Sequence, residues 1–335
     1  MNKLRKLIWI IAVAFSILPL SKSLGQKKVS YDGYFELGGE AEYKAIYIES
    51  FYKIKLEYKI KINDYAKIQI DMRSNSEKRL LELYEGSAEF AIGKGVELKV
   101  GDLKKRYGLE EQTSREKLPF INESMINEYL EPLGFVSRDP GFQISWSDDD
   151  EKTILTGGLH YNESHRLTIM TLVKRKNFLG IDKVGAVFEL ARERDNDLSH
   201  TYIANINAAE DFGFVNCEFE LFTGQDPIES YYRKLNCDGK MVNYFAASTM
   251  LTKKIPIGCE CFDSIEPLIL LQLLSKDIDQ FDVNNIQLLA GLNIYFDEDI
   301  RFMINGNLIM SNHEYDKAKR TFYGSDASAQ LQIRW

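Results

Sequence analysis

The stretch from residue 46 to residue 62, IYIESFYKIKLEYKIKI, decides the fold. Its side chains fall into two alternating sets. One set is Ile46, Ile48, Ser50, Tyr52, Ile54, Leu56, Tyr58, Ile60 and Ile62, and the other is Tyr47, Glu49, Phe51, Lys53, Lys55, Glu57, Lys59 and Lys61. Because successive side chains of a strand point to opposite faces, this period predicts a β-strand. The stretch far exceeds the ~5–6 residues of an ordinary strand, and its length is typical of a closed membrane barrel.

The same alternation recurs along most of the chain, and no amphipathic helix is evident that could cover the apolar faces. Lipid is the simplest partner for so much outward apolar surface. The sequence therefore predicts an all-β transmembrane antiparallel barrel. We expect sixteen strands, at approximately 29–39, 46–62, 65–73, 81–92, 96–104, 140–147, 153–162, 165–175, 183–193, 200–209, 213–223, 240–250, 264–276, 286–296, 300–310 and 325–335. A slip of one hairpin would give about 14 or 18 strands instead.

The connections between these strands give a test of the count. Short periplasmic turns are expected at 63–64, 93–95, 148–152 and 297–299, and longer external connections at 74–80, 105–139, 224–239 and 311–324. Two connections do not fit, because 163–164 is very short and 251–263 is long on the periplasmic side. The last strand ends on Trp335, and an aromatic end of this kind resembles the signal read by the barrel assembly machinery of outer membranes.

The first 25 residues have the pattern of a secretory signal peptide. Lys3, Arg5 and Lys6 precede an apolar run over 7–20, and Ser23 and Gly25 suit a cleavage before Gln26. A membrane anchor is the alternative, but the run is shorter than the ~18–20 residues of a spanning helix. We therefore expect residues 26–335 to form the mature barrel, exported to the outer membrane of a Gram-negative bacterium. The net charge of −8 argues against nucleic-acid binding.

Cysteine and histidine usage does not point to a reaction centre. Cys217, Cys237, Cys259 and Cys261 have irregular spacings, so structural cysteines are favoured over a disulfide framework, and three pairings stay open. The four histidines are scattered, and the sequence has no metalloprotease, nucleophile-elbow or P-loop motif. We predict no enzyme activity, cofactor or metal. A structural or adhesive barrel is the main alternative to a channel, and a barrel lipase or protease is a weaker one.

One segment carries a resemblance to a known family. Residues 100–114 read VGDLKKRYGLEEQTS, followed by Phe120 and Ser124. Gly101, Lys104, Gly108, Leu109, Glu110, Glu111, Thr113 and Ser114 match the third-loop motif of the phosphate-selective porin O and P family. The chain thus resembles an outer-membrane porin, which implies a homotrimer and a passive channel for anions such as phosphate. Arg106-Tyr107 replaces the family's Pro-Phe, and Glu123 stands where the family has arginine, which puts phosphate specificity in doubt.

A candidate pore follows from these patterns. The 105–139 connection is long enough to be functional, and its position favours a loop folded into the barrel as a constriction. We expect its charged residues to line that constriction: Lys104, Lys105, Arg106, Glu110, Glu111, Arg115, Glu123, Glu128 and Arg138. Opposite them we expect a basic wall of Lys53, Lys55, Lys59, Lys61, Lys67, Arg73 and Lys99. Charges in a pore select ions by sign, and the constriction selects by size. The expected solutes are small ions or hydrophilic molecules, and neither the solute nor the sign of selectivity follows from the sequence.

Overall fold

The computed structural model of the protein describes residues 29–42, 47–76, 81–136, 138–161, 166–192, 200–235, 241–259, 261–278, 284–311 and 324–335. The expected signal peptide lies outside these residues. Within them, no helix is both long enough and apolar enough to cross a membrane.

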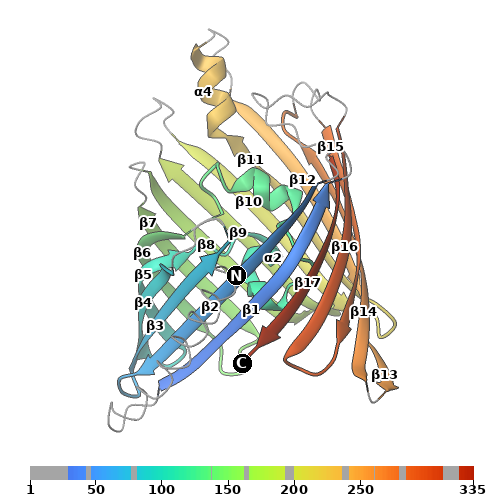
Figure 1. The fold of residues 1–335 in the computed structure, drawn as a ribbon. Helices are drawn as coiled ribbons and strands as arrows, with labels where there is room; N and C mark the ends of the chain where they lie inside the picture. Colours follow the sequence, from blue (N-terminus) through green and yellow to red (C-terminus); the bar gives the residue numbers. More distant parts are fainter. Residues whose placement is uncertain are drawn as a thin grey trace.

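The chain forms a closed antiparallel barrel (Figure 1). Seventeen strands fill sixteen positions around the ring, because two consecutive strands share one position. The first strands are β1 (Val29–Glu42), β2 (Tyr47–Lys61), β3 (Ala66–Asn75), β4 (Glu82–Gly93), β5 (Val96–Lys104), β6 (Arg138–Ser147), β7 (Thr153–Tyr161), β8 (Leu167–Phe178) and β9 (Ile181–Arg192). They are followed by β10 (Thr201–Asp211), β11 (Asn216–Asp226), β12 (Val242–Thr252), β13 (Ile255–Cys259), β14 (Phe262–Ser275), β15 (Asn284–Tyr295), β16 (Ile300–Ser311) and β17 (Gly324–Arg334). The sixteen-stranded barrel predicted from the sequence is confirmed, and each predicted strand overlaps an observed one.

The ring closes between its first and last strands. β1 pairs with β17 in antiparallel register from Tyr34↔Arg334 to Glu42↔Asp326. Beyond this ladder, the N–H of Gly33 donates to the carbonyl oxygen of Trp335 over 3.2 Å, and the N–H of Trp335 donates to the oxygen of Gly33 over 3.1 Å. Closure leaves the ring without a free strand edge, which is the condition for a sheet to exist inside lipid.

The segment from 251 to 263 differs from its predicted role as a long connection. After Thr252 the chain resumes as β13, which pairs only with β14, so β12 and β13 together form one interrupted strand along β14. The interruption explains why the sequence pattern broke there. A register shift between Pro256 and Cys259 and a positive φ of 66° at Gly258 add local irregularity to β13.

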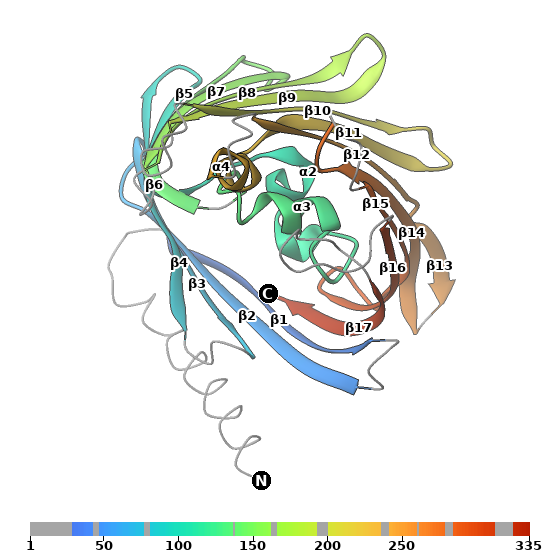
Figure 2. The same cartoon turned by 90° about the horizontal axis from the view of Figure 1, so that it is seen from above.

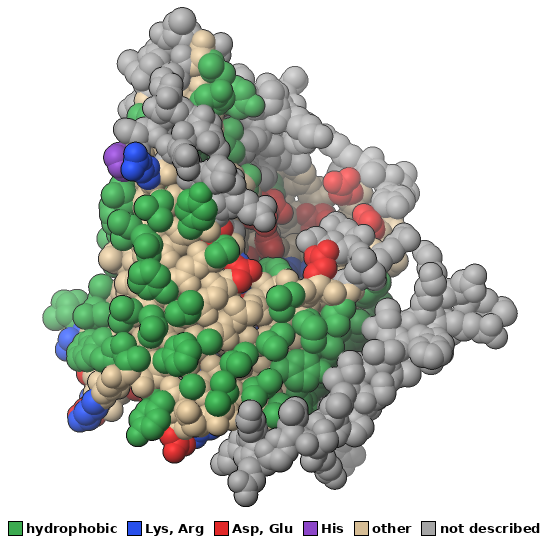
Figure 3. Space-filling view, turned by 90° about the vertical axis from the view of Figure 1, so that its left-hand side faces the viewer, with side chains coloured by type: hydrophobic (Ala, Val, Ile, Leu, Met, Phe, Trp, Pro, Cys, Tyr) green, Lys and Arg blue, Asp and Glu red, His purple; other side chains and the backbone are tan. Residues whose placement is uncertain are grey.

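Hydrophobic side chains are spread over the outer face of the barrel that Figure 3 shows. On β6, for example, Phe142, Ile144 and Trp146 are exposed, whereas Gln143 is buried on the inner face. This is the reverse of a water-soluble protein and suits an outer surface that faces lipid. Figure 3 also shows carboxylate side chains within the hollow at one end of the molecule.

The inner face of the barrel is not polar all round. Along β8, Leu167, Ile169 and Val173 face outward, and Met170 and Leu172 are buried on the inner side. Val187, Ile203 and Phe222 continue this apolar inner surface on β9, β10 and β11. Part of the lumen wall is therefore built to pack against protein rather than water.

In the part of the chain that the structure describes, three α-helices lie between strands, and the sequence predicted none of them. α2 (Gly108–Gln112) and α3 (Met125–Leu130) lie in the β5–β6 connection, separated by a 3-10 turn at Arg115–Lys117. α4 (Pro227–Leu235) follows β11 and projects at the opposite end from the short turns (Figure 1). Viewed from above, α2 and α3 lie inside the ring of strands (Figure 2).

Candidate functional site: the lumen and the segment within it

The β5–β6 connection contacts the inner face of the barrel far from its own strands. We call residues 105–136 the lumen segment. The backbone N–H of Ile121 donates to Asn305 Oδ1 over 2.7 Å, and that of Met125 donates to Gln287 Oε1 over 2.9 Å. The N–H of Ile126 donates to Gln272 Oε1 over 3.0 Å. Polar side chains on the inner face of β14, β15 and β16 thus accept hydrogen bonds from backbone N–H groups of the segment. These N–H groups have no partner within a strand or helix.

Apolar packing fixes the same segment on the β8–β14 side. Met125, Ile126, Tyr129, Leu130 and Phe135 are almost fully buried. They form one cluster with Met170, Leu172, Val187, Ile203, Phe222, Tyr244, Ala246 and Leu274 of the barrel wall. Burying each such side chain contributes on the order of 1.5–3 kcal/mol. This packing explains why the inner faces of β8 to β14 are apolar, and it holds the segment against one side of the lumen.

A buried ion pair anchors the start of the segment to its end. Lys105 is fully buried, and its Nζ lies 2.7 Å from Asp139 Oδ2 and donates to the carbonyl oxygen of Gly134. Glu189 of β9 lies 3.9 Å from the same ammonium. Burial of these charges is tolerated because each has a partner.

Two cavities flank residues 109–118 of the segment. The larger, with a volume of about 380 Å³, lies against the inner wall of β1 to β6. The smaller, of about 170 Å³, lies toward β11, β12 and β14, where Glu218, Glu220 and Glu266 line it. Glu110, Thr113, Lys117 and Leu118 line both cavities, so the segment separates them. We call the larger one the wall cavity.

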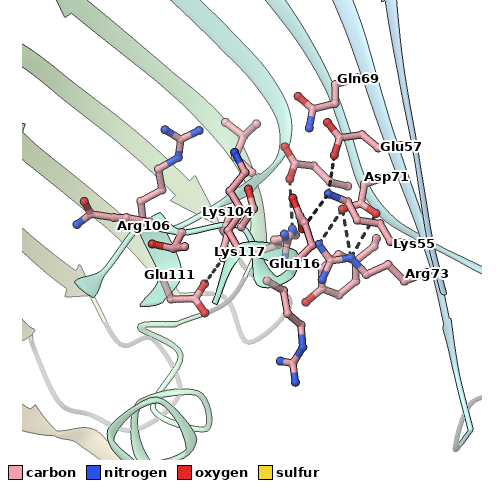
Figure 4. Close-up of a pocket in the computed structure, with 18 of the residues that line it drawn as sticks. Lys55, Glu57, Gln69, Asp71, Arg73, Lys104, Arg106, Glu111, Glu116 and Lys117 are labelled. Atoms are coloured by element: carbon pink, nitrogen blue, oxygen red, sulfur yellow. Dashed lines mark hydrogen bonds and ion pairs between the residues drawn. The ribbon is translucent and has the colours of Figure 1, made fainter. Parts of the chain in front are cut away.

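The wall side of this cavity carries ion pairs between neighbouring residues (Figure 4). Glu57 accepts from Lys55 at 2.6 Å and from Lys59 at 2.7 Å, and Lys55 also lies 3.8 Å from Glu116 of the lumen segment. Arg73 binds Asp71 at 2.8 Å. The period-two pattern of β2 and β3 produces these pairs, because residues i and i+2 share a face.

A second group of charges comes from β4, β5 and β6. Glu85 accepts from Lys99 at 2.8 Å and from Arg138 at 3.3 Å, and Glu89 pairs with Lys67 at 2.5 Å and Lys99 at 3.6 Å. A β-bulge between Asp71 and Met72 of β3 lets Tyr84 of β4 join Glu85 in the cavity lining.

The ring of Tyr84 contacts two guanidinium groups. The ring centroid is 3.7 Å from the guanidinium carbon of Arg73 and 3.9 Å from that of Arg138. Cation–π contacts of this kind contribute on the order of 0.5–2 kcal/mol and fix both arginines in place.

The predicted site residues separate into those that line the wall cavity and those that do not. Lys55, Lys59, Arg73, Lys99, Lys104, Arg106, Glu110, Glu111, Arg115, Glu123 and Arg138 line it. Lys53, Lys61 and Lys67 are not in the lining. Lys53 lies over the ring of Phe51, Lys61 pairs with Asp64, and Lys67 pairs with the lining residue Glu89. Lys105 is in the buried ion pair, and Glu128 of α3 is exposed but is not among the lining residues.

The expected basic wall is electrically balanced in the structure. Its cavity-lining cations are Lys55, Lys59, Arg73, Lys99 and Arg138, and its carboxylates are Asp32, Glu57, Asp71, Glu85 and Glu89. The sequence predicted an excess of positive charge on this wall because the carboxylates of β4 were not counted. The alternation of Glu85, Ser87 and Glu89 along that strand was a signal that could have found its two carboxylates. Sequence analysis also missed Tyr84, Glu116 and Lys117.

Charges on the lumen segment are paired as well, with few exceptions. Lys104 lies 3.1 Å from Glu111, and Arg115 lies 3.1 Å from Glu123. Burial raises the pKa of Glu110 to about 8, although the N–H and hydroxyl of Ser124 donate to its carboxylate. The Glu128 side chain is open to the lumen, but its partial desolvation inside the barrel and the nearby carboxylates of Glu123, Asp326 and Glu40 raise its pKa to about 7. Both groups therefore change charge near neutral pH.

No family model and no curated protein matches the sequence. Solved structures of bacterial outer-membrane proteins do match the fold. OmpT of Vibrio cholerae in its trimer form has a TM-score of 0.65 at 8% identity, over 92% of this chain and 99% of that chain. OmpF of Salmonella typhi has a TM-score of 0.63 at 11% identity, over 92% and 98%. The anion-selective porin of Comamonas acidovorans has a TM-score of 0.56 at 12% identity, over 92% and 99%.

The fold defined by the strands is therefore that of bacterial outer-membrane porins. At these identities the likeness concerns the fold alone. The resemblance of residues 101–114 to the phosphate-selective family stays a prediction.

Proposed function

We propose that the protein is a passive aqueous channel for small hydrophilic solutes in the outer membrane. The observation that carries this proposal is the position of the lumen segment. The hydrogen bonds to Asn305, Gln287 and Gln272 and the apolar cluster hold it against the far wall. A cavity of about 380 Å³ lined by charged side chains lies between it and the β1–β6 wall. Channels select solutes at a constriction, where the width limits their size and fixed charges select their sign.

The chemistry of the wall cavity favours a channel over an enzyme. Its acids and bases are engaged mainly with each other, as in the Lys55–Glu57–Lys59 and Lys99–Glu85–Arg138 groups. A catalytic constellation needs a nucleophile or base oriented toward a substrate position. His160, the buried histidine of the described residues, lies against Gln143 in the wall rather than in the lining.

The proposal includes a location and an assembly. The apolar outer face and the closed ring suit an outer-membrane protein exported by the signal peptide at 1–25 and assembled through the strand that ends at Trp335. We also propose a homotrimer, supported by the resemblance at residues 101–114 and by the trimeric form of the similar Vibrio cholerae protein.

A second candidate is an anion channel, with phosphate as one solute. Arg106 and Lys117 favour it, because both are exposed in the lumen and neither has an ion-pair partner among the described residues. The balanced charge of the wall speaks against strong anion selectivity.

Planar-bilayer recording tests both candidates. The purified, folded barrel should conduct, and its zero-current potential under a KCl gradient should be small, because the cations and carboxylates of the wall are equal in number. A potential of anion-selective sign together with block of the current by phosphate would favour the second candidate. Absence of conductance from a barrel that circular dichroism shows to be folded would contradict the channel and favour a structural or adhesive role.

A further inference from the structure

Four carboxylates gather on the inner face of the barrel at the end where β1 finishes and α4 projects (Figure 1). Glu40 of β1 lies directly opposite Glu49 of β2 in the strand register, and Glu42 of β1 lies directly opposite Asp326 of β17. They share the inner face with the buried Glu36, because residues two positions apart on a strand point to the same side. We call these four residues the acidic rim. Figure 3 shows carboxylate side chains within the hollow at this end.

The lumen segment adds a fifth carboxylate that faces the acidic rim. Asn122 Nδ2 donates to Glu40 Oε2 over 3.1 Å, so the segment reaches the wall at this point. Glu128 of α3 is exposed, and the carboxylates that act on it include Glu40 and Asp326 of the rim. Acidic groups therefore lie on two sides of the hollow, on the wall and on the segment.

None of these five carboxylates is in an ion pair within the described part of the chain. The Glu40 carboxylate accepts its hydrogen bond from an amide, that of Asn122. Asp326 Oδ2 likewise accepts from the amide of Asn307, over 2.8 Å. Lys53 of β2 acts on Glu40 from a longer distance. Like charges directly opposite each other on neighbouring strands repel, so a cation from solution would relieve this repulsion.

The wall next to the rim already holds one ammonium group. Lys53 Nζ lies 4.9 Å from the ring centroid of Phe51, and Glu36 and Glu40 are among the carboxylates that attract it. The Oε2 atom of Glu36 is buried and has no hydrogen-bond partner among the described residues. Aromatic faces and carboxylates are the groups that recognise ammonium ions. The chemistry of this wall therefore suits ammonium groups, and this observation is independent of the rim itself.

From this arrangement we propose that the acidic rim selects small organic dications, molecules that carry an ammonium group at each end of a short chain. One ammonium would lie beside the Glu40–Glu49 pair and the other beside the Glu42–Asp326 pair. The proposal rests on the channel function proposed above and names its solute class.

The spacing of the rim residues favours a diamine. Directly opposite residues have Cβ atoms ~4.5–5.5 Å apart, and residues two positions apart on one strand are separated by roughly 7 Å. The two carboxylate pairs are therefore about as far apart as two ammonium groups joined by four carbons. A diamine can place one positive charge beside each pair, whereas a monovalent cation neutralises one pair at most.

The charge of the rim explains why dications are favoured over anions and over monovalent cations. Every member of the rim repels an anion, and a neutral solute gains no Coulomb energy. A potential that enriches a monovalent cation about threefold enriches a dication about ninefold, because the exponent of the Boltzmann factor is proportional to the charge. A small zero-current potential in KCl is therefore compatible with a strong preference for dications.

Zero-current potentials in planar bilayers test this solute class. The full chain is studied at a pH above the pKa of Glu128, which is about 7, so that this carboxylate is ionised. KCl on one side faces the dichloride of 1,4-diaminobutane on the other or, in a separate run, dipotassium succinate, a dianion with the same number of carbons. Low ionic strength limits the screening of the rim. The diammonium should be at least about tenfold more permeant than succinate, since an acidic opening enriches cations and depletes anions.

Substitutions at the rim locate the effect. Glu42→Gln with Glu49→Gln removes two of its charges, and both side chains are exposed and outside the ion pairs of the described residues, so this variant should fold. Its preference for the diammonium should fall on the order of threefold. Glu298→Gln with Asp299→Asn is the matched control, because it removes the same charge from the exposed β15–β16 turn at the opposite end. The control should keep the wild-type ratio.

The outcomes separate this proposal from the channel function. If a folded barrel conducts KCl but passes succinate as readily as the diammonium, the selection of dications is wrong and the channel remains. If a folded barrel does not conduct KCl, the channel function itself is wrong. A preference that survives in the rim variant, or that falls equally in the control, would contradict the assignment to the acidic rim.

Discussion

The hydroxyl of Tyr129 in α3 donates a 2.8 Å hydrogen bond to Asp226 Oδ2 at the end of β11. The other oxygen of the same carboxylate accepts from the N–H groups of Ile228 and Glu229, and so caps the start of α4. Asp226 therefore joins the helix inside the barrel to the helix that projects beyond it. The bond is buried, so it has no competition from bulk water.

Removing this hydrogen bond should loosen the lumen segment. Tyr129→Phe keeps the ring and deletes the donor, which we expect to cost ~0.5–1.5 kcal/mol of unfolding free energy. The midpoint of unfolding in detergent should fall, and the open-channel current should become noisier as the segment moves. Tyr232→Phe is the matched control, since Tyr232 is exposed on α4. Equal stability and equal noise in Tyr129→Phe and the wild type would show that the bond does not hold the segment.

Breaking the Lys105–Asp139 ion pair should lower the unfolding free energy more than removing the Tyr129 hydrogen bond does. Lys105→Met leaves the Asp139 carboxylate buried without its cation, and breaking a buried pair from one side costs ~3–5 kcal/mol. We expect the lumen segment to become sensitive to trypsin at Arg115 and Lys117, and the conductance to rise. The double variant Lys105→Met with Asp139→Asn removes both charges and should regain much of the protease resistance. A single variant as resistant as the wild type would contradict the anchoring role.

Neutralising a wall cation should change selectivity only where it lines the cavity. Lys55→Gln leaves Glu57 and Glu116 with less compensation, so the zero-current potential should shift toward cation selectivity. Lys61→Gln removes the same charge at the short-turn end, outside the cavity lining, and should have a smaller effect. Equal shifts in the two variants would show that ions do not pass along this wall.

Selectivity should also depend on pH. Because the pKa of Glu128 is raised to about 7, its carboxyl is neutral below that pH and negative above it. The charges that surround it are Glu123 and Glu131 of the lumen segment, Glu40 of β1 and Asp326 of β17. Cation selectivity should therefore increase as pH rises through about 7. Glu128→Gln should reduce this increase, and Glu110, whose pKa is about 8, should contribute to the part that remains. A variant with the full wild-type pH response would exclude Glu128 as a contributor.

The sequence predicted the barrel because its strongest signal is a long alternation of outward and inward side chains, which is the pattern of a barrel strand. The alternation in β2 and β17 is long and uninterrupted, and it located an early strand and the last strand of the ring. The alternation is weakest from β8 to β14, because the lumen segment packs on the inner face of these strands. In β8, Met170 and Leu172 face the segment while Ile169 and Val173 face outward, so both faces are apolar and the period is weak.

The site was harder to predict than the fold, for three physical reasons. α2 and α3 have five and six residues, which is too short for a helical period to appear in the sequence. The bulge that brings Tyr84 into the lumen changes the face of the sheet on which one residue lies, and no sequence pattern predicts it. The pairing of Lys99 with Glu85 and Glu89 depends on the register between β4 and β5, and this register cannot be read from either strand alone.

Chemical modification of a single introduced cysteine in the wall cavity tests the central claim most directly. Ser114 is exposed in the lining, so in a chain with all four native cysteines changed to serine, Ser114→Cys should react with a charged methanethiosulfonate reagent. The account predicts a stepwise fall in single-channel conductance, because the adduct occupies the path beside the lumen segment. Asp149→Cys, at an exposed turn outside the cavity, should react without changing the conductance. Complete modification at Ser114→Cys with unchanged conductance would contradict the account, because the current would then bypass the wall cavity.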